Sequence, residues 1–261
     1  MIVIKYGGNA MTDIALKKSF ASEIAALNAE GLAPVVVHGG GPQISAMLKK
    51  LSLEGEFRGG YRVTTAEVAQ VVRTVLAGEV RSEIVALVNS SGGRAVGVGG
   101  DDGSLFVAAK RKVLVDGVQT DIGLVGDVVK VNGTIIHSLL AAGFTPVVSS
   151  YASDSDGQVL NVNADTAAGT LAGALSATTL VMLTDVPGLY TQWPDETSFV
   201  AAISVDDARE LLPSLSEGMV PKIEAALNAL EAGVKEVRIV DGRIPGIIHL
   251  ALSGAAGTVI S

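Results

Sequence analysis

Cysteine is absent from the 261-residue chain, and histidine is scarce. Without cysteine there are no disulfides, thiolate metal ligands or cysteine nucleophiles. His38, His137 and His249 lie far apart and form no HExxH-type pair, so we predict no metal site. No apolar run approaches the ~20 residues that cross a bilayer, and the N-terminal MIVIKYGG looks like a strand and turn rather than a leader. We therefore expect a cytoplasmic protein with no membrane partner.

Basic residues are outnumbered, with 19 Lys and Arg against 27 Asp and Glu, which gives a formal charge of −8. An acidic chain without a basic run or aromatic platform is a poor nucleic-acid binder, so we expect no such partner. Aromatic residues make up only 4%, although hydrophobic residues make up 48% and glycine is abundant at 31 residues. This aliphatic composition excludes disorder. It favours buried parallel strands with helices packed closely over them.

Hydrophobic periodicity predicts an α/β fold, because short β-branched runs alternate with longer helical patterns. The predicted strands are 2–5, 34–37, 95–100, 145–148, 179–183 and 236–240, and the predicted helices are 12–29, 42–51, 65–90, 164–175, 205–212 and 221–232. Residues 111–132 read as a hairpin around DG and NG turns, 154–163 as a smaller one, and 257–261 as a possible edge strand. A weak boundary near residue 175 divides a single domain, 1–261, into lobes 1–175 and 176–261 that share one sheet.

Glycine-bearing turns follow three predicted strands: KYGGNA (5–10), VHGGGPQ (37–43) and TDVPGLY (184–190). In open parallel sheets, ligands bind beyond the carboxyl ends of the strands. Glycine pairs there let backbone N–H groups approach an anion. A tight turn alone would explain one such case, but two in the first 41 residues favour phosphate binding. The sequence has no GxxxxGK[ST], complete GxGxxG, GxSxG, HRD or DFG motif, so the site belongs to another phosphate-binding class.

Two lysines stand out beside these turns. Lys5 ends an apolar strand just before Gly7 and Gly8, and Lys222 follows Gly218 at a proline-initiated helix start. Phosphoryl transfer needs cations that hold the transferring charge from both sides. The alternatives are a strand-end lysine that extends to solvent and a lysine on a solvated helix face.

Polar residues in two further segments could bind the substrate. Arg62, on a Gly-rich loop, has the planar fork that suits a carboxylate, although a surface arginine is the alternative. Asn161, Asn163 and Asp165 share one side at period two. Asp165 could instead cap the helix that begins at 166. His38 is interpreted as a hydrogen-bonded core histidine, with a supporting role behind the site as the alternative.

Five motifs together resemble the amino-acid kinase family. They are KYGGNA, VHGGGPQI, the element F-x-x-G-x-R-V-T (57–64), NVNAD and GMVPK. The resemblance runs from Ile2 to Thr258 and implies a three-layer αβα sandwich around a mainly parallel sheet. Within the family, the motifs are most similar to members that phosphorylate N-acetyl-L-glutamate in the second step of arginine biosynthesis. The implied partners are therefore N-acetyl-L-glutamate and ATP, with Mg²⁺ carried mainly by the nucleotide.

The resemblance also implies a role for each matched residue. Lys5 and Lys222 would stabilise the transferring phosphoryl group, and Asp165 would hold both lysines in place. Substrate would be bound in the N-terminal lobe, and ATP in the C-terminal lobe. The implied substrate-binding residues are Gly40, Gly41, Arg62 and Asn161. The implied nucleotide- or phosphate-binding residues are Gly7, Gly8, Asp185, Val186, Pro187, Gly188, Leu189, Tyr190 and Gly218.

Several alternatives remain open at this point. A sister enzyme of the family phosphorylates carrier-protein-linked aminoadipate in lysine biosynthesis, although VHGGGPQI followed by GYRVTT favours the acetylated substrate. A non-catalytic nucleotide- or arginine-sensing protein could use the same scaffold, and a nicotinamide-binding Rossmann protein is weakened by the missing GxGxxG. Arginine-inhibited members carry an extra N-terminal helix that joins dimers into hexamers. Since this sequence lacks it, we expect a homodimer that meets through the helix at 65–90, with weak or no arginine feedback.

Overall fold

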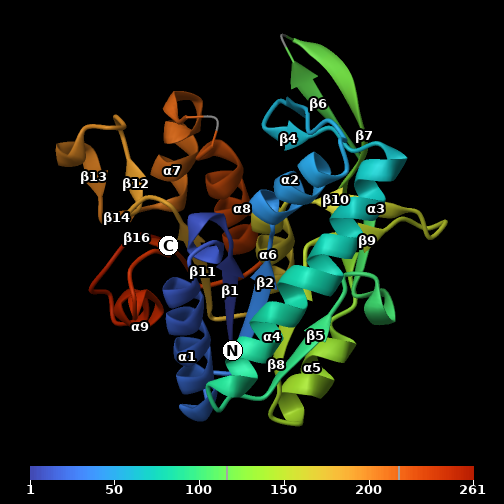
Figure 1. Ribbon diagram of the computed structural model, residues 1–261. Coiled ribbons are helices and arrows are strands. Elements are labelled where there is room, and N and C mark those ends of the chain that lie inside the picture. The colour runs from blue at the N-terminus through green and yellow to red at the C-terminus, as the bar shows by residue number, and fades with distance from the viewer. Residues whose placement is uncertain (116, 217) are drawn as a thin grey trace.

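The computed structural model describes residues 1–115, 117–216 and 218–261. Within these residues, its central sheet has eight strands in the order β14-β16-β15-β11-β1-β2-β8-β5 (Figure 1). Neighbouring strands are parallel except for β15 and β16. These strands are β1 (Ile2–Tyr6), β2 (Pro34–His38), β5 (Ala95–Val98), β8 (Thr145–Ser149), β11 (Thr179–Thr184), β14 (Ala202–Ile203), β15 (Glu236–Asp241) and β16 (Thr258–Ile260). The α/β class with a mainly parallel sheet, predicted from the sequence, is confirmed.

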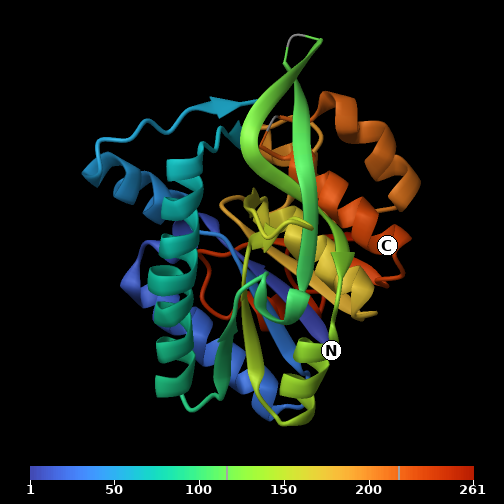
Figure 2. The ribbon, with the colours of Figure 1, turned by 90° about the vertical axis from the view of Figure 1, so that its right-hand side faces the viewer.

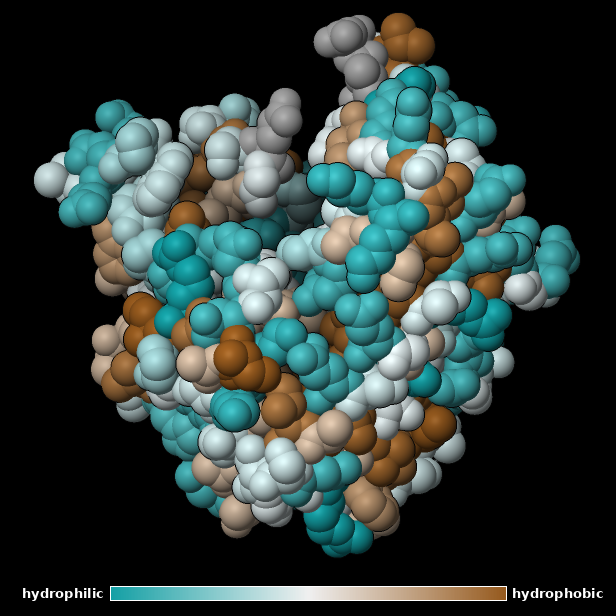
Figure 3. Space-filling model, in the orientation of Figure 1, coloured by the Kyte–Doolittle hydropathy of each residue, from teal (hydrophilic) through white to brown (hydrophobic). Residues whose placement is uncertain are grey.

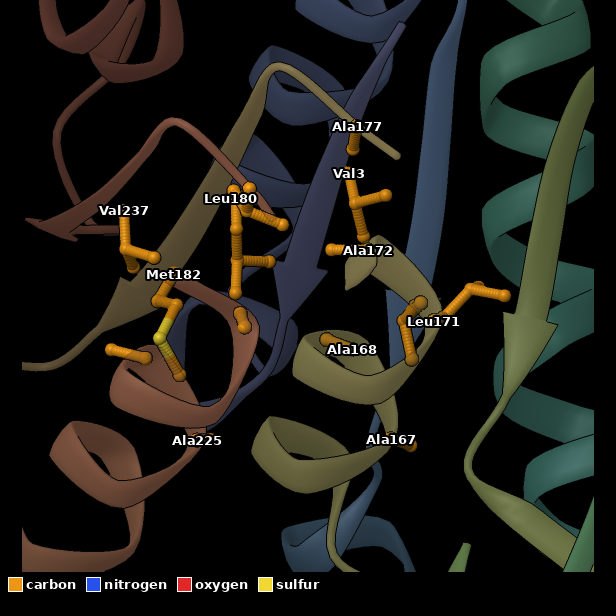
Figure 4. Close-up of a cluster of buried hydrophobic side chains, with 14 of the residues drawn as sticks. Val3, Ala167, Ala168, Leu171, Ala172, Ala177, Leu180, Met182, Ala225 and Val237 are labelled. Carbon is orange, nitrogen blue, oxygen red and sulfur yellow. The ribbon is translucent and has the colours of Figure 1, made fainter. Parts of the chain in front are cut away.

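Helices cover both faces of this sheet and complete three layers. One face carries α1 (Ile14–Ala29), α2 (Gly41–Lys50), α3 (Ala66–Thr74), α4 (Arg81–Ser90) and α9 (Ile247–Leu252), and the other carries α5 (Thr134–Ala141), α6 (Ala164–Ala174), α7 (Val205–Leu211) and α8 (Val220–Glu231). The period-two pattern of β1 explains this arrangement. Ile2 and Ile4 pack in the cluster under α1, whereas Val3 packs in the cluster formed with α6 and α8 (Figure 4).

A second β-structure rises above the carboxyl end of the sheet. The long strands β6 (Phe106–Val115) and β7 (Val118–Val131) form a hairpin that closes a small barrel with β9 (Tyr151–Ser153) and β10 (Val159–Val162) (Figures 1 and 2). Two short strand pairs flank the same end, β3 (Phe57–Arg58) with β4 (Tyr61–Arg62) and β12 (Leu189–Tyr190) with β13 (Phe199–Val200). Both pairs therefore adjoin the end of the sheet where parallel α/β folds bind ligands.

Three local predictions were wrong in detail. The NG dipeptide at 132–133 is not a hairpin turn, because it leads directly into α5. The small hairpin pairs β10 with β9, so its first strand precedes residue 154 and the segment 154–158 is its turn. The strand at the C-terminus lies inside the sheet rather than at its edge, because β14 pairs with its outer side. Asp116 of the predicted DG turn lies outside the described residues.

The helix predicted at 65–90 is a continuous helical segment with one irregularity. Between α3 and α4, the six residues Val75–Val80 form a π-helical turn. This turn lies against the glycine loop that follows β2, where Leu76 and Val80 approach Gly40. Within the described residues, no helix is long and apolar enough to cross a membrane.

Candidate active site

The predicted glycine turns meet at the carboxyl ends of neighbouring strands. Lys5 pairs with Val37 in β2 on one side and with Met182 in β11 on the other, so the turns after these three strands converge. Figure 3 shows that this end of the molecule is hollowed between the region of α7 and the β6–β7 hairpin. The site is thus assembled from segments that are far apart in the sequence.

A buried carboxylate joins the two lysines singled out in the sequence. Asp165, in the first turn of α6, has its Oδ1 atom 3.0 Å from Lys5 Nζ, and its Oδ2 atom accepts a hydrogen bond of 2.9 Å from Lys222 Nζ. Lys5 and Asp165 are 6% and 5% exposed, whereas the Lys222 side chain keeps 22% of its surface. Lys5 comes from the end of β1 and Lys222 from the first turn of α8. Two cations from opposite parts of the chain therefore share one anion.

The charge states of this cluster follow from burial and mutual attraction. Burial alone would raise the pKa of Asp165, but the charges and hydrogen bonds of Lys5 and Lys222 outweigh it and hold that pKa at about 2. For Lys5, burial lowers the pKa below its ordinary value, with Asp165 opposing the shift and Lys222 adding to it. The carboxylate is ionised at neutral pH. When both lysines are protonated the cluster is net positive, which suits an incoming anion.

The cap of α6 differs from the alternative considered for Asp165. Asn163 is the N-cap, and its side chain accepts hydrogen bonds from the backbone N–H groups of Asp165 and Thr166. Asp165 is the second residue of α6, so capping does not use its carboxylate. The positive end of the helix dipole further stabilises a carboxylate at this position.

The turn after β1 is held by Asp185, which follows β11. Gly8 adopts φ +73°, and a Cβ there would lie 2.7 Å from Asp185 Oδ1. Both carboxylate oxygens are engaged: the Asn9 backbone N–H donates to Oδ1 at 2.8 Å, and Asn9 Nδ2 donates to Oδ2 at 3.3 Å. At Gly7 a Cβ would lie 2.8 Å from Lys5 Nζ. Glycine at both positions therefore leaves room for the ammonium and the carboxylate that flank the turn.

Both glycine turns line a pocket of about 320 Å³, called here the inner pocket. It brings together most of the residues that the sequence analysis assigned to catalysis and substrate. The assigned residues that line it are Lys5, Gly7, Gly8, Gly40, Gly41, Arg62, Asn161 and Asp165. Gly40 packs closely against the π-helical turn between α3 and α4, since a Cβ there would lie 2.7 Å from Leu76 Cδ2.

Arg62 and Asn161 both line the inner pocket. Arg62, on β4, is 7% exposed and donates to Ser45 Oγ at 2.8 Å, while its guanidinium carbon lies 4.6 Å from the centre of the Phe57 ring. Its burial lowers the pKa of this guanidinium, which still remains a cation at neutral pH. Asn161, on β10, donates to Thr64 Oγ1 at 3.3 Å. The surface-arginine alternative is wrong.

A second hollow of about 580 Å³, the outer pocket, lies on the C-terminal half of the chain. Among the predicted nucleotide-binding residues, Val186 and Tyr190 line it, and Gly218 directly precedes its lining residue Met219. The full lining is Val186, Tyr190, Thr191, Gln192, Trp193, Ser214, Leu215, Ser216 and Met219. Tyr190 packs edge-on against Trp193 at 5.1 Å between ring centres.

Other predicted nucleotide residues lie elsewhere. Gly188 packs against Thr258, and Leu189 is buried with its N–H donating to Thr258 Oγ1 at 2.8 Å. Pro187 is exposed, and Asp185 holds the Gly8 turn. The structure therefore does not bring these four residues into either pocket, and their contact with nucleotide stays a prediction.

The outer pocket also contains residues that sequence reasoning missed. Trp193 and Leu215 are apolar residues from segments without a motif, and Met219 lies within GMVPK but was not assigned a role. The one available signal was the local concentration of aromatic residues, because Tyr190, Trp193 and Phe199 lie within ten residues of one another in a chain that is 4% aromatic. No group of three or more His, Cys, Asp or Glu side chains that could hold a metal ion occurs among the described residues.

Known proteins match this chain over almost its whole length. A family model described as the amino acid kinase family matches residues 1–241. A protein of Mycolicibacterium smegmatis named acetylglutamate kinase is 57% identical over 258 residues, covering 99% of this chain and 88% of its own. One of Nocardia farcinica with the same name is 56% identical over 257 residues, with 98% and 85% covered. Among solved structures, an N-acetylglutamate synthase of Neisseria gonorrhoeae complexed with coenzyme A and N-acetyl-glutamate has a TM-score of 0.84 at 25% identity, covering 100% of this chain and 59% of its own.

Proposed function

The chain belongs to the amino acid kinase family, and on that premise we propose that it transfers the γ-phosphoryl group of ATP to the γ-carboxylate of N-acetyl-L-glutamate. Relatives named acetylglutamate kinase match nearly the whole chain at 56–57% identity. The observation that carries the mechanism is the Lys5–Asp165–Lys222 cluster beside a pocket with backbone donors. The product is an acyl phosphate of arginine biosynthesis.

The reaction requires no general base. A carboxylate oxygen of the substrate attacks the γ-phosphorus, the new O–P bond forms, and the bond to the bridging oxygen breaks with its electron pair leaving on ADP. Since the attacking group is already ionised at pH 7, no proton has to be removed. This accounts for a site built from lysines and glycines, with no histidine among the residues that line the inner pocket in the described structure.

The main barrier is repulsion between anions, and the site opposes it with fixed positive charge. Lys5 and Lys222 approach the transferring phosphoryl group from two sides, and Asp165 fixes the distance between their ammonium groups. Backbone N–H groups of Gly8 and Gly40 add dipoles without bringing carbon atoms between donor and anion. The net charge of −8 gives no long-range attraction for anions, so the local positive potential of the site has to attract them.

We assign the amino acid to the inner pocket and the nucleoside to the outer pocket. In the inner pocket, Arg62 binds the α-carboxylate of the substrate bidentately, and Asn161 binds the acetylamino group. In the outer pocket, Tyr190 and Trp193 offer ring faces to the adenine, while Val186 and Met219 enclose it. ATP enters as its magnesium complex and is written here as substrate. Gly218, just before α8, lets Lys222 adjust as the phosphates arrive.

The alternatives are less well supported. The names of the relatives favour acetylglutamate over a carrier-linked aminoadipate substrate. The names of the relatives likewise do not favour a non-catalytic sensor.

One assay separates these functions. Purified protein with Mg-ATP and hydroxylamine is given N-acetylglutamate, glutamate or aminoadipate, and hydroxamate is measured. We expect hydroxamate with N-acetylglutamate at a rate at least about 10²-fold above that with glutamate, whose charged amine meets a site made for an amide. No turnover with any acidic amino acid contradicts an enzymatic function.

We further propose a cytoplasmic homodimer. Its contact is the outward side of the α3–α4 helix, which runs along one flank of the molecule (Figure 2). At the middle of this helix Gly78 is exposed and a Cβ there would meet nothing within 4 Å, so a partner helix can approach closely. Gly78→Trp should shift the sedimentation coefficient to that of a monomer, whereas Asp206→Trp, at an exposed position of α7 on the other face of the sheet, should leave it unchanged.

A further inference from the structure

One buried histidine lies directly behind the glycine loop of the inner pocket. His38, the last residue of β2, is 0% exposed, and Gly39–Gly41 follow it. Its Nδ1 atom lies 2.8 Å from the carbonyl oxygen of Gly39, and its Nε2 atom lies 3.0 Å from Ser149 Oγ. Neither the proposed chemistry nor the pocket lining uses this side chain.

The contacts of His38 determine which nitrogen carries the proton. A carbonyl oxygen can only accept, so Nδ1 is the protonated nitrogen and donates to Gly39. Burial lowers the pKa of His38 to about 4, with the Gly39 hydrogen bond opposing the shift and the charge of Arg81 adding to it. The ring is therefore neutral at pH 7. Nε2 is then an acceptor, and the Ser149 hydroxyl donates to it.

Ser149 is itself held in place. It ends β8 directly opposite His38 in the parallel register, and it is 0% exposed. Its Oγ atom also lies 3.4 Å from the carbonyl oxygen of Leu76, in the π-helical turn. The same Leu76 approaches Gly40 with its side chain. The imidazole is thus fixed between the carboxyl end of β8 and the α3–α4 helix, and cannot rotate without breaking these contacts.

We infer that His38 positions the Gly40 amide: by holding the Gly39 carbonyl behind the loop, it directs the Gly40 N–H into the inner pocket. In a planar trans peptide, the C=O and N–H groups point in opposite directions. Among the described residues, the one cis peptide bond is Trp193–Pro194, so the Gly39–Gly40 peptide is trans. Fixing its oxygen on the His38 side fixes its hydrogen on the pocket side, where Gly40 lines the cavity.

This positioning matters because glycine peptides rotate easily. Gly39, Gly40 and Gly41 have no side chains that could restrain their backbone dihedrals, so a donor made from this loop needs an external restraint. Pre-organised donors contribute most when they need no reorganisation during the reaction. The ring also polarises the peptide through its hydrogen bond, which strengthens the Gly40 N–H as a donor. That this N–H binds the carboxylate of N-acetylglutamate rests on the proposed function.

The test compares three variants of the full-length protein. His38→Leu fills the space but removes the donor to Gly39, whereas His38→Asn keeps an N–H near the Nδ1 position. Thr145→Val is the matched control, because Thr145 is a 1% exposed polar residue at the far end of β8. For each variant, kcat and both KM values are measured per mole of folded protein, together with the free energy of unfolding.

We expect His38→Leu to lower kcat/KM for N-acetylglutamate on the order of 10²-fold, with the KM for ATP within about threefold of wild type. His38→Asn should recover all but about fivefold of that loss, and Thr145→Val should match wild type. Equal kinetic losses in the Leu and Asn variants, or losses confined to stability, overturn the inference. If wild-type protein fails to turn over N-acetylglutamate, crystal structures of wild type and His38→Leu still decide: an unchanged Gly39–Gly40 peptide orientation overturns it, and a rotated one supports it.

Discussion

Replacing Asp165 with asparagine tests the centre of the proposed active site. The asparagine has nearly the same shape but no charge, so it leaves two ammonium groups beside a neutral amide. Because Asp165 is 5% exposed and paired with both lysines, its carboxylate is little screened by solvent. Its pKa falls from 3.8 to about 2 in the folded protein. That shift corresponds to roughly 2 kcal/mol of stabilisation at neutral pH.

The sign of the pH dependence follows from this depressed pKa. The stabilisation is fully present above the unfolded pKa of 3.8 and is lost as the pH falls towards about 2. Wild type should therefore lose roughly 2 kcal/mol more than Asp165→Asn between pH 6 and pH 2, measured by denaturant unfolding. At pH 7 the variant should be about 2–4 kcal/mol less stable, because it leaves buried charge unpaired.

The same variant should lower kcat on the order of 10²-fold, since the lysines lose their common anchor. Its KM values should change by less than about fivefold, because Asp165 does not bind either substrate in this mechanism. Asp156→Asn is the control, as Asp156 is exposed in the turn before β10. If Asp165→Asn retains wild-type kcat and the same pH dependence of unfolding as wild type, the reasoning about the cluster is wrong.

Three further predictions concern single contacts. Lys222→Ala should lower kcat by roughly 10²-fold in the hydroxamate assay. An unchanged kcat would mean that Lys222 is a solvated helix residue without a part in the reaction. Arg62→Ala should raise the KM for N-acetylglutamate at least about tenfold with the KM for ATP unchanged; an effect confined to ATP contradicts its assignment. His249 lies within 2.9 Å of Glu23 and 3.2 Å of Glu30, and these carboxylates outweigh burial and raise its pKa. A raised pKa gives stability that is present below the unfolded value of 6.5 and is lost as the pH rises through the folded pKa. His249→Gln should therefore flatten the plot of unfolding free energy against pH between pH 6 and 8. An unchanged slope of that plot refutes this prediction.

The sequence was informative wherever a local pattern carries its own geometry. Lys5 could be placed at a strand end because the strand is apolar and two glycines follow it. In the structure Ile4 packs in the cluster under α1 and Lys5 lines the inner pocket, as neighbouring residues of a strand point to opposite faces. Pro42 near the start of a helix and Gly31 after one gave boundaries within one or two residues.

Contacts between distant segments could not be predicted from local patterns. The hydrogen bond between Lys222 and Asp165 spans 57 positions and was implied only by the family resemblance, and the anchoring of the Gly8 turn by Asp185 depends on β1 and β11 being neighbours. Asn163 as the cap was missed because Asp165 is an equally good capping residue on propensity alone. The π-helical turn has no sequence signal in VLAGEV, and it matters only because Gly40 packs beside it.

The most direct test of the account is a crystal structure with N-acetylglutamate, Mg-ADP and a planar aluminium fluoride in place of the transferring phosphoryl group. We predict the fluoride between the substrate γ-carboxylate and ADP, with Lys5 and Lys222 Nζ on two sides of it, both still bound to Asp165, and with the Gly8 and Gly40 N–H groups directed at its anionic atoms. An anion bound away from the inner pocket, or a lysine that points away from it, would contradict the central claim.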